Sequence, residues 1–168
     1  MIIQRRINGE QDFDKNWQEY VDGFGDFNGD FWFGLEKLHL LTSSDRHQLN
    51  ISMTSYGLTS FVEYDDFRIG NSESLYELES LGTFIMGSKI YPFNKNSLKA
   101  KVNKKFSTYD KNNIPNAYEN CAENGMGGWW YWFCIDSNLN APYKDEMVWS
   151  YNKLTSATMK IRPYSNEY

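Results

Sequence analysis

The spacing of apolar residues changes from a helical period to a strand period near Asp45, so the protein must combine helices with a sheet. One helical pattern follows Asp12, the expected N-cap, and ends at Gly23 and Gly25. Its apolar members are Phe13, Trp17, Tyr20 and Val21. A second helix is predicted over Phe31–Leu41.

Beyond the change of period, Leu49, Ile51 and Met53 alternate with polar residues, which is typical of a strand with one buried face. Strand patterns continue over 61–64 and 76–81 with turn residues between them, so we expect an antiparallel meander. Short strands are also predicted at 2–7 and 157–162, near the two ends of the sequence. Residues 93–131 are loop-like, and a long irregular region in a compact domain is usually functional.

Composition places the protein among folded domains and excludes several partners. Its 168 residues suit one domain, and 17% aromatic residues argue against disorder. The longest apolar runs are too short to cross a bilayer, and a net charge of −5 opposes general attraction to nucleic acid or anionic lipid. We therefore expect neither nucleic-acid binding nor membrane insertion. The basic cluster of Lys99, Lys101, Lys104 and Lys105 is interpreted as a solvated edge.

No catalytic motif stands out in the sequence. His39 and His47 lie outside metal-ligand motifs, and neither a nucleophile elbow nor a phosphate-binding glycine loop occurs. No spacing among the acidic residues singles out a catalytic pair. Catalysis is therefore the weakest of the functional hypotheses.

Two segments could provide a binding function. The run Trp129–Phe133, beside Cys134, could fill a core or provide a stacking wall for a sugar ring or an acetyl methyl group. Strand alternation would direct about half of these rings inward. The oxygen-rich loop from Asp110 to Cys121 suits a hard cation only weakly, because few of its residues are acidic. From their spacing alone, the two cysteines could be a pair or two free thiols.

Several motifs follow one another in a fixed order from residue 2 to residue 163. They are Ile2-Ile3-Gln4-Arg5-Arg6, Phe31-Trp32-Phe33-Gly34-Leu35, Phe106-Ser107-Thr108-Tyr109-Asp110, Asn120-Cys121-Ala122, Gly128-Trp129-Trp130 and Met159-Lys160-Ile161-Arg162-Pro163. In this order they resemble the fibrinogen C-terminal domain family, which includes ficolins and tachylectins. The resemblance implies an α+β fold, with a twisted antiparallel sheet, short helices and a long irregular C-terminal subdomain for ligand and calcium. It implies one domain over 1–168 that lacks the usual first part of the N-terminal subdomain.

The same resemblance implies a disulfide between Cys121 and Cys134, and therefore an extracellular location. In that setting, Asn50-Ile51-Ser52 is a possible N-glycosylation sequon.

Calcium is the cofactor that the resemblance suggests, through Asp110, Asn112 and the carbonyls of Ala117 and Glu119. Asn112 and Ile114 replace two carboxylates of the family pattern, which removes charge that sets affinity. The expectation is a weak or lost calcium site.

The resemblance also places a ligand pocket around the second cysteine. Its residues here would be Phe133, Cys134, Ile135, Tyr143 and Trp149. The family has a cis peptide before this cysteine and commonly a histidine after it. A cis Phe133–Cys134 bond would keep the pocket geometry, whereas Ile135 removes a hydrogen-bond donor. Core packing is an equal alternative for Trp149.

These features give three functional hypotheses. The first is an extracellular, non-catalytic recognition module for acetylated or other glycans. The second is a protein-binding adhesion or receptor-ligand module, and the third is a degenerate product without a binding role. No coiled-coil heptad occurs in the sequence, so any oligomer would form through other polypeptides.

Overall fold

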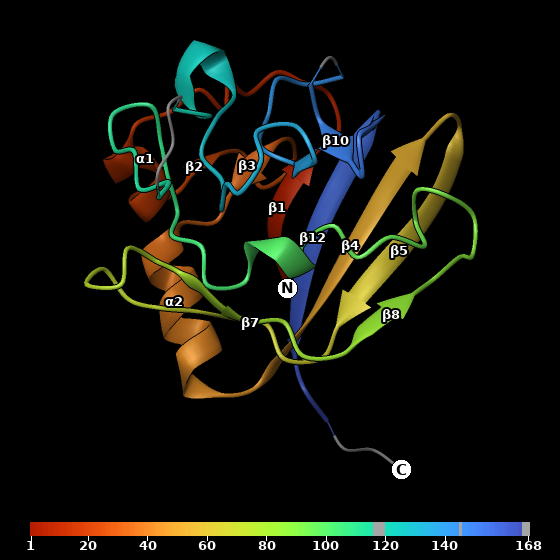
Figure 1. Cartoon of the computed structure of the whole chain (residues 1–168), viewed down its shortest axis with the longest axis horizontal. Helices are drawn as coiled ribbons and strands as arrows, with labels where there is room; N and C mark the ends of the chain where they lie inside the picture. Colours follow the sequence, from red (N-terminus) through yellow and green to blue (C-terminus); the bar gives the residue numbers. More distant parts are fainter. Residues whose placement is uncertain (116–119, 145, 166–168) are drawn as a thin grey trace.

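A seven-stranded antiparallel sheet organises the molecule in a computed structural model that describes residues 1–115, 120–144 and 146–165. Figure 1 shows the long central strands of this sheet side by side, with helix α2 and the irregular segments beside it. In spatial order the strands are β2 (Phe24–Gly25), β3 (Phe31–Trp32), β1 (Ile2–Arg6), β12 (Ser156–Pro163), β4 (His47–Ser55), β5 (Leu58–Tyr64) and β8 (Phe84–Met86).

The centre of the sheet follows from the alternating sequence pattern. On β4, Ile51 faces Met159 of β12 on one side and Val62 of β5 on the other, and all three are fully buried. The intervening β4 residues are half-buried on the opposite face. Because β12 lies between β1 and β4, the first and last strands of the protein are neighbours. The alternation over 49–53 and the strand at 157–162 are confirmed.

Helix α1 (Trp17–Asp22) begins later than predicted. Its N-cap is Asn16, because Asn16 and Glu19 form a capping box with hydrogen bonds of 2.9 and 3.0 Å. Asp12 instead accepts a hydrogen bond from the Asp14 amide in the preceding turn. The prediction of Asp12 as the cap was therefore wrong, whereas the predicted end is confirmed by the C-cap at Gly23.

Helix α2 (Leu35–Ser44) also differs from the predicted range of 31–41. Phe31 and Trp32 pair with Arg5 and Gln4 of β1, so sheet hydrogen bonds override the helical spacing there. Gly34 separates strand from helix with a φ of 108°, in the region that favours glycine.

Short elements complete the fold. Residues 76–81 do not continue the meander as predicted; β7 (Leu78–Ser80) pairs with β6 (Arg68–Ile69), and β8 takes the place beside β5. The C-terminal region contains a small sheet that the sequence pattern does not predict, made of β9 (Ser137–Asn138), β10 (Val148–Trp149) and β11 (Asn152–Lys153). Single 3₁₀ turns occur at η1 (Lys99–Lys101) and η2 (Glu123–Gly125).

An aromatic core joins the sheet to the irregular C-terminal region. The ring of Phe106 lies 5.9 Å from Trp32 of β3 and 5.1 Å from Trp130, measured between ring centroids. Trp129, Trp130 and Tyr131 are all buried, whereas Trp132 is exposed. The aromatic run therefore does not alternate as a strand would, because it forms a loop whose first three rings fill the core.

Candidate functional site

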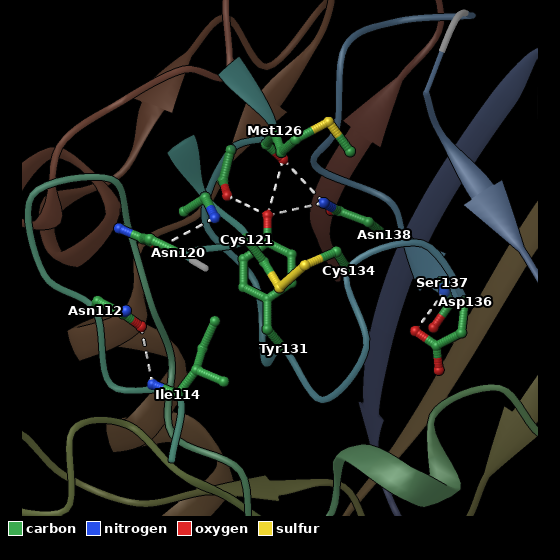
Figure 2. Close-up of a disulfide and its surroundings, with 12 residues drawn as sticks. Asn112, Ile114, Asn120, Cys121, Met126, Tyr131, Cys134, Asp136, Ser137 and Asn138 are labelled. Carbon is green, nitrogen blue, oxygen red and sulfur yellow. Dashed lines mark hydrogen bonds between the residues drawn. A yellow bond between two sulfur atoms is a disulfide. The ribbon is translucent and has the colours of Figure 1, made fainter. Parts of the chain in front are cut away.

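The disulfide between Cys121 and Cys134 joins two irregular segments of the C-terminal region, with a Cα–Cα distance of 5.1 Å. Figure 2 shows this disulfide beside Tyr131. The pairing implied by the family resemblance is therefore present, and it fixes both ends of the loop that contains the aromatic run.

A buried hydrogen-bond network supports this loop from within. The Tyr131 hydroxyl donates to the carbonyl of Met126 at 3.0 Å or to that of Gly127, and it accepts from Asn138 Nδ2 at 3.0 Å. Asn138 Nδ2 also donates to the Met126 carbonyl at 2.9 Å, and these bonds are drawn in Figure 2. Burial raises the pKa of Tyr131 well above its ordinary value, so the hydroxyl stays protonated and can donate.

An ion pair fixes the C-terminal side of the loop. Lys101 Nζ lies 2.7 Å from Asp136 Oδ1, and the lysine is fully buried. The same carboxylate oxygen accepts from the Ser137 amide at 2.8 Å. Burial lowers the pKa of Lys101, and attraction to Asp136 opposes that shift. The interpretation of the lysine cluster as a solvated edge is therefore wrong for Lys101.

The loop presents three large apolar side chains to solvent. Trp132, Phe133 and Ile135 are 42%, 58% and 61% exposed. The rings of Trp132 and Phe133 meet edge to face at 5.6 Å, and Lys104 Nζ lies 4.0 Å from the Trp132 ring centroid. A disulfide-linked loop with exposed rings and a cation can stack against a sugar ring or an apolar side chain and can attract a negative group.

The predicted pocket residues divide among three places. Phe133 and Ile135 lie on the exposed loop, on either side of the half-buried Cys134. Trp149 is fully buried on β10, with its Nε1 donating to the Lys95 carbonyl at 3.0 Å, so it presents no face to a ligand. The Phe133–Cys134 bond is trans; the cis bond among the described residues is Tyr91–Pro92.

Tyr143, far along the sequence, lies beside the C-terminal end of β1. Its hydroxyl donates to the Ile7 carbonyl, and its ring packs closely over Gly9. It borders a separate pocket of about 290 Å³ that Arg6 and Gly125 also line. Phe133 and Ile135 are thus both exposed on the same loop, whereas Tyr143 belongs to a different surface.

The residues predicted for calcium are engaged within the protein. Asp110 Oδ1 accepts from the Trp17 amide at 2.9 Å and from the Thr108 hydroxyl at 2.7 Å. Asn112 Oδ1 accepts from the Ile114 amide at 3.1 Å. Ala117 and Glu119 lie outside the described residues. Within 1–115, 120–144 and 146–165, no group of three acidic, histidine or cysteine side chains is placed to hold a metal ion. Weak calcium binding stays a prediction.

The predicted sequon lies on the open face of the large sheet. Asn50 is half-buried on β4, and its Nδ2 donates to Glu63 Oε1 at 3.0 Å. Glycosylation at Asn50 stays a prediction.

Two residues of the exposed loop surface are not predicted as ligand contacts from the sequence. From the sequence, Trp132 is recognised only as a member of the aromatic run, and Lys104 is recognised only as part of a basic cluster. The sequence shows the aromatic run at 129–133 and the four lysines at 99–105 as separate features, and it does not indicate that they meet.

The fold and its disulfide-fixed loop define a fibrinogen-like globular domain. The protein belongs to the family formed by the C-terminal globular domains of fibrinogen beta and gamma chains, whose family model matches residues 1–165.

Curated relatives match nearly the whole chain. Chicken (Gallus gallus) tenascin-R is 35% identical over 99% of this chain and 12% of its own length. Ryncolin-4 of Cerberus rynchops is 35% identical over 99% of this chain and 50% of its own length. Rat (Rattus norvegicus) fibrinogen-like protein 1 is 34% identical over 96% of this chain and 58% of its own length. The chain thus spans from about an eighth to somewhat more than half of these relatives.

Solved structures share the fold. The fibrinogen-like globe domain of human ANGPTL2 superposes with a TM-score of 0.85 at 31% identity, covering 98% of this chain and 80% of that one. The lamprey fibrin D-dimer, complexed with the peptide ligand Gly-His-Arg-Pro-amide, gives a TM-score of 0.81 at 26% identity. The match covers 99% of this chain and 62% of that one. Within the part of the protein that the structure describes, no helix has the length and apolar character needed to cross a membrane.

Proposed function

We propose that this domain is an extracellular, non-catalytic recognition module that binds acetylated or other glycans through the loop surface of Trp132, Phe133 and Ile135. The observation that carries the proposal is the exposed pair of rings on a loop fixed at Cys134. Because the disulfide and the Tyr131 network already order this loop, a ligand would lose little affinity to loop ordering.

The extracellular setting is supported by the disulfide. A disulfide in a domain without free cysteines among its described residues is typical of proteins that fold in oxidising compartments.

A second candidate function is recognition of a protein. The structural neighbour from lamprey is complexed with a peptide ligand, and Ile135 favours an apolar contact over a hydrogen bond to a sugar. In this alternative the same loop surface would contact an apolar segment of a receptor.

Retention on beads tests the glycan proposal. The oxidised protein is applied to acetylated and to non-acetylated beads, each with calcium and with a chelator. We expect retention on acetylated beads only, lost in Phe133→Ser and kept in Leu40→Ser, a matched control because Leu40 is equally exposed on α2 (58%). Loss of retention with chelator would support calcium at Asp110.

Failure on both kinds of bead by a folded, disulfide-bonded sample would overturn recognition of acetylated ligands. Crosslinking to a protein partner that Phe133→Ser abolishes and Leu40→Ser preserves would then favour the second candidate.

A further inference from the structure

One stretch of the sequence has a charge opposite to that of the whole. Between Glu79 and Asp110 there is no acidic residue, although the protein has a net charge of −5. Six lysines lie in this interval: Lys89, Lys95, Lys99, Lys101, Lys104 and Lys105. Lys101 is neutralised by Asp136, whereas Lys89 and Lys95 are exposed in the segment between β8 and η1. That segment therefore carries an uncompensated positive charge.

The same segment exposes apolar side chains. Met86, Ile90 and Tyr91 are 47%, 56% and 51% exposed. In Figure 1 the segment that follows β8 turns outward and then crosses β5 and β4. It lies on the core side of the sheet, because the Tyr64 hydroxyl of β5 donates to Asn96 Oδ1 at 2.9 Å.

Two further parts of the protein extend this surface. The Tyr91 hydroxyl donates to the Ser150 carbonyl at 2.8 Å, which places the exposed Tyr151 beside it. The Ser55 hydroxyl donates to the Lys153 carbonyl at 2.9 Å, and Ser55 pairs with the exposed Leu58. We call this surface the lysine-rimmed patch; its apolar members are Leu58, Met86, Ile90, Tyr91 and Tyr151, and its exposed lysines are Lys89, Lys95 and Lys153.

Strand β8 forms the border of this patch and one edge of the seven-stranded sheet. Its residues Phe84–Met86 pair with β5 on one side, and among the described strands none pairs on the other. Two acidic side chains lie near β8. Glu63 faces Ile85 on the opposite side of the sheet and accepts from Asn50. Asp65 accepts from the Thr83 amide just before β8, and its charge is paired with Arg46 at 3.0 Å. Edge strands are commonly protected by charged residues or proline, and β8 contains neither.

We propose that the lysine-rimmed patch is a docking surface for an acidic, extended segment of another protein, which adds as a strand along β8. Backbone hydrogen bonds to the open edge would align the segment. Its apolar side chains would cover Met86 and Ile90 beside the edge, and its carboxylates would face Lys89 and Lys95. This surface is separate from the disulfide loop, so the inference does not rest on the proposed function.

Two other occupants fit less well. A second copy of the protein would bring like-charged lysine rims together, which opposes association. An anionic membrane would suit the lysines and tyrosines but would leave the backbone groups of the β8 edge without partners. An acidic peptide satisfies the charge, the apolar surface and the open edge together.

The probe for this inference is a fluorescent synthetic peptide that alternates glutamate with isoleucine, compared with its counterpart that carries lysine in place of glutamate. Binding is measured by fluorescence anisotropy with the full-length protein at low and high salt. We expect the glutamate peptide alone to bind, more weakly at high salt because rim charges are screened. The double variant K89E/K95E should weaken binding about tenfold or more.

The matched control is K105E/K160E, which changes net charge equally at exposed lysines outside the patch. It should bind as the wild type does. Equal weakening in both variants, equal binding of both peptides, or no binding to either by folded protein would overturn the proposal. Two further results would also overturn the proposal, because each identifies a different occupant. One is a dimer, detected by light scattering, that K89E/K95E abolishes. The other is co-sedimentation with phosphatidylserine vesicles without peptide binding.

Discussion

Lys101 Nζ contacts Asp136 Oδ1 at 2.7 Å, and the lysine is wholly buried while the aspartate side chain keeps 14% exposure. This asymmetry predicts unequal effects of removing either charge. Asp136→Asn leaves a buried ammonium without its counter-charge and should lower the free energy of unfolding by about 3 to 5 kcal/mol. Lys101→Met leaves a carboxylate that water can partly solvate and should cost less.

Urea unfolding of the two variants measures this difference. The double variant K101M/D136N, which buries no charge at this position, should be more stable than D136N alone. Equal losses in the two single variants would contradict the asymmetry.

The disulfide should contribute to stability by restricting the unfolded polypeptide. Cys121 and Cys134 are separated by 13 positions, and a loop of that length contributes about 3 kcal/mol in the chain-entropy model. The variant C121A/C134A should lose that amount in urea unfolding. Wild-type protein unfolded under reducing conditions provides the control and should show a similar loss. An unchanged free energy of unfolding in both samples would contradict the prediction.

Gly127 should tolerate no side chain, because two constraints coincide there. Its φ is 74°, and a β-carbon would overlap the Asn140 carbonyl oxygen. Gly57 has a similar φ of 78° but open space around its α-carbon, so it isolates the backbone cost. We expect Gly57→Ala to cost about 1 to 2 kcal/mol from φ alone. Gly127→Ala should cost clearly more in thermal or urea unfolding, and equal losses would contradict the steric argument.

Alkaline pH should destabilise the fold through its buried tyrosines. Burial raises the pKa of Tyr20, Tyr64 and Tyr131 above the ordinary value of about 10. Above about pH 10 these side chains ionise in the unfolded state before they do in the folded one. The stabilisation is therefore complete below that pH and is lost as the pH rises, by up to about 1.4 kcal/mol per pH unit for each tyrosine.

Burial lowers the pKa of Arg6 to about 10, so the arginine opposes the tyrosines above that pH. Burial also lowers the pKa of Lys101, but its opposing effect lies below its ordinary value of 10.5 and is complete before most of the tyrosine effect develops. Three tyrosines outnumber them, and a net loss of stability should remain. Tyr64→Phe should reduce the pH slope of the unfolding free energy, whereas the exposed Tyr151→Phe should leave it unchanged. A slope that Tyr64→Phe does not alter would contradict this account.

Local pattern predicted the central sheet well, because alternation along β4 and β12 reports burial directly. It misplaced the start of α2, since Phe31 and Trp32 have helical spacing but find sheet partners in β1. For Trp149 the family resemblance offered a pocket position with core packing as the alternative, and β10 buries the side chain completely. Those outcomes depend on partners far along the sequence, which local spacing does not contain.

The residue pattern was sufficient for the antiparallel strands, the net charge, the family through its ordered motifs and, through that family, the disulfide pair. It did not reveal which aromatic side chains face solvent or which lysine is buried, because exposure and ion pairing depend on long-range packing. Phe133 lies on the surface because the rings of residues 129–131 fill the core, and Lys101 is buried because Asp136 lies opposite it.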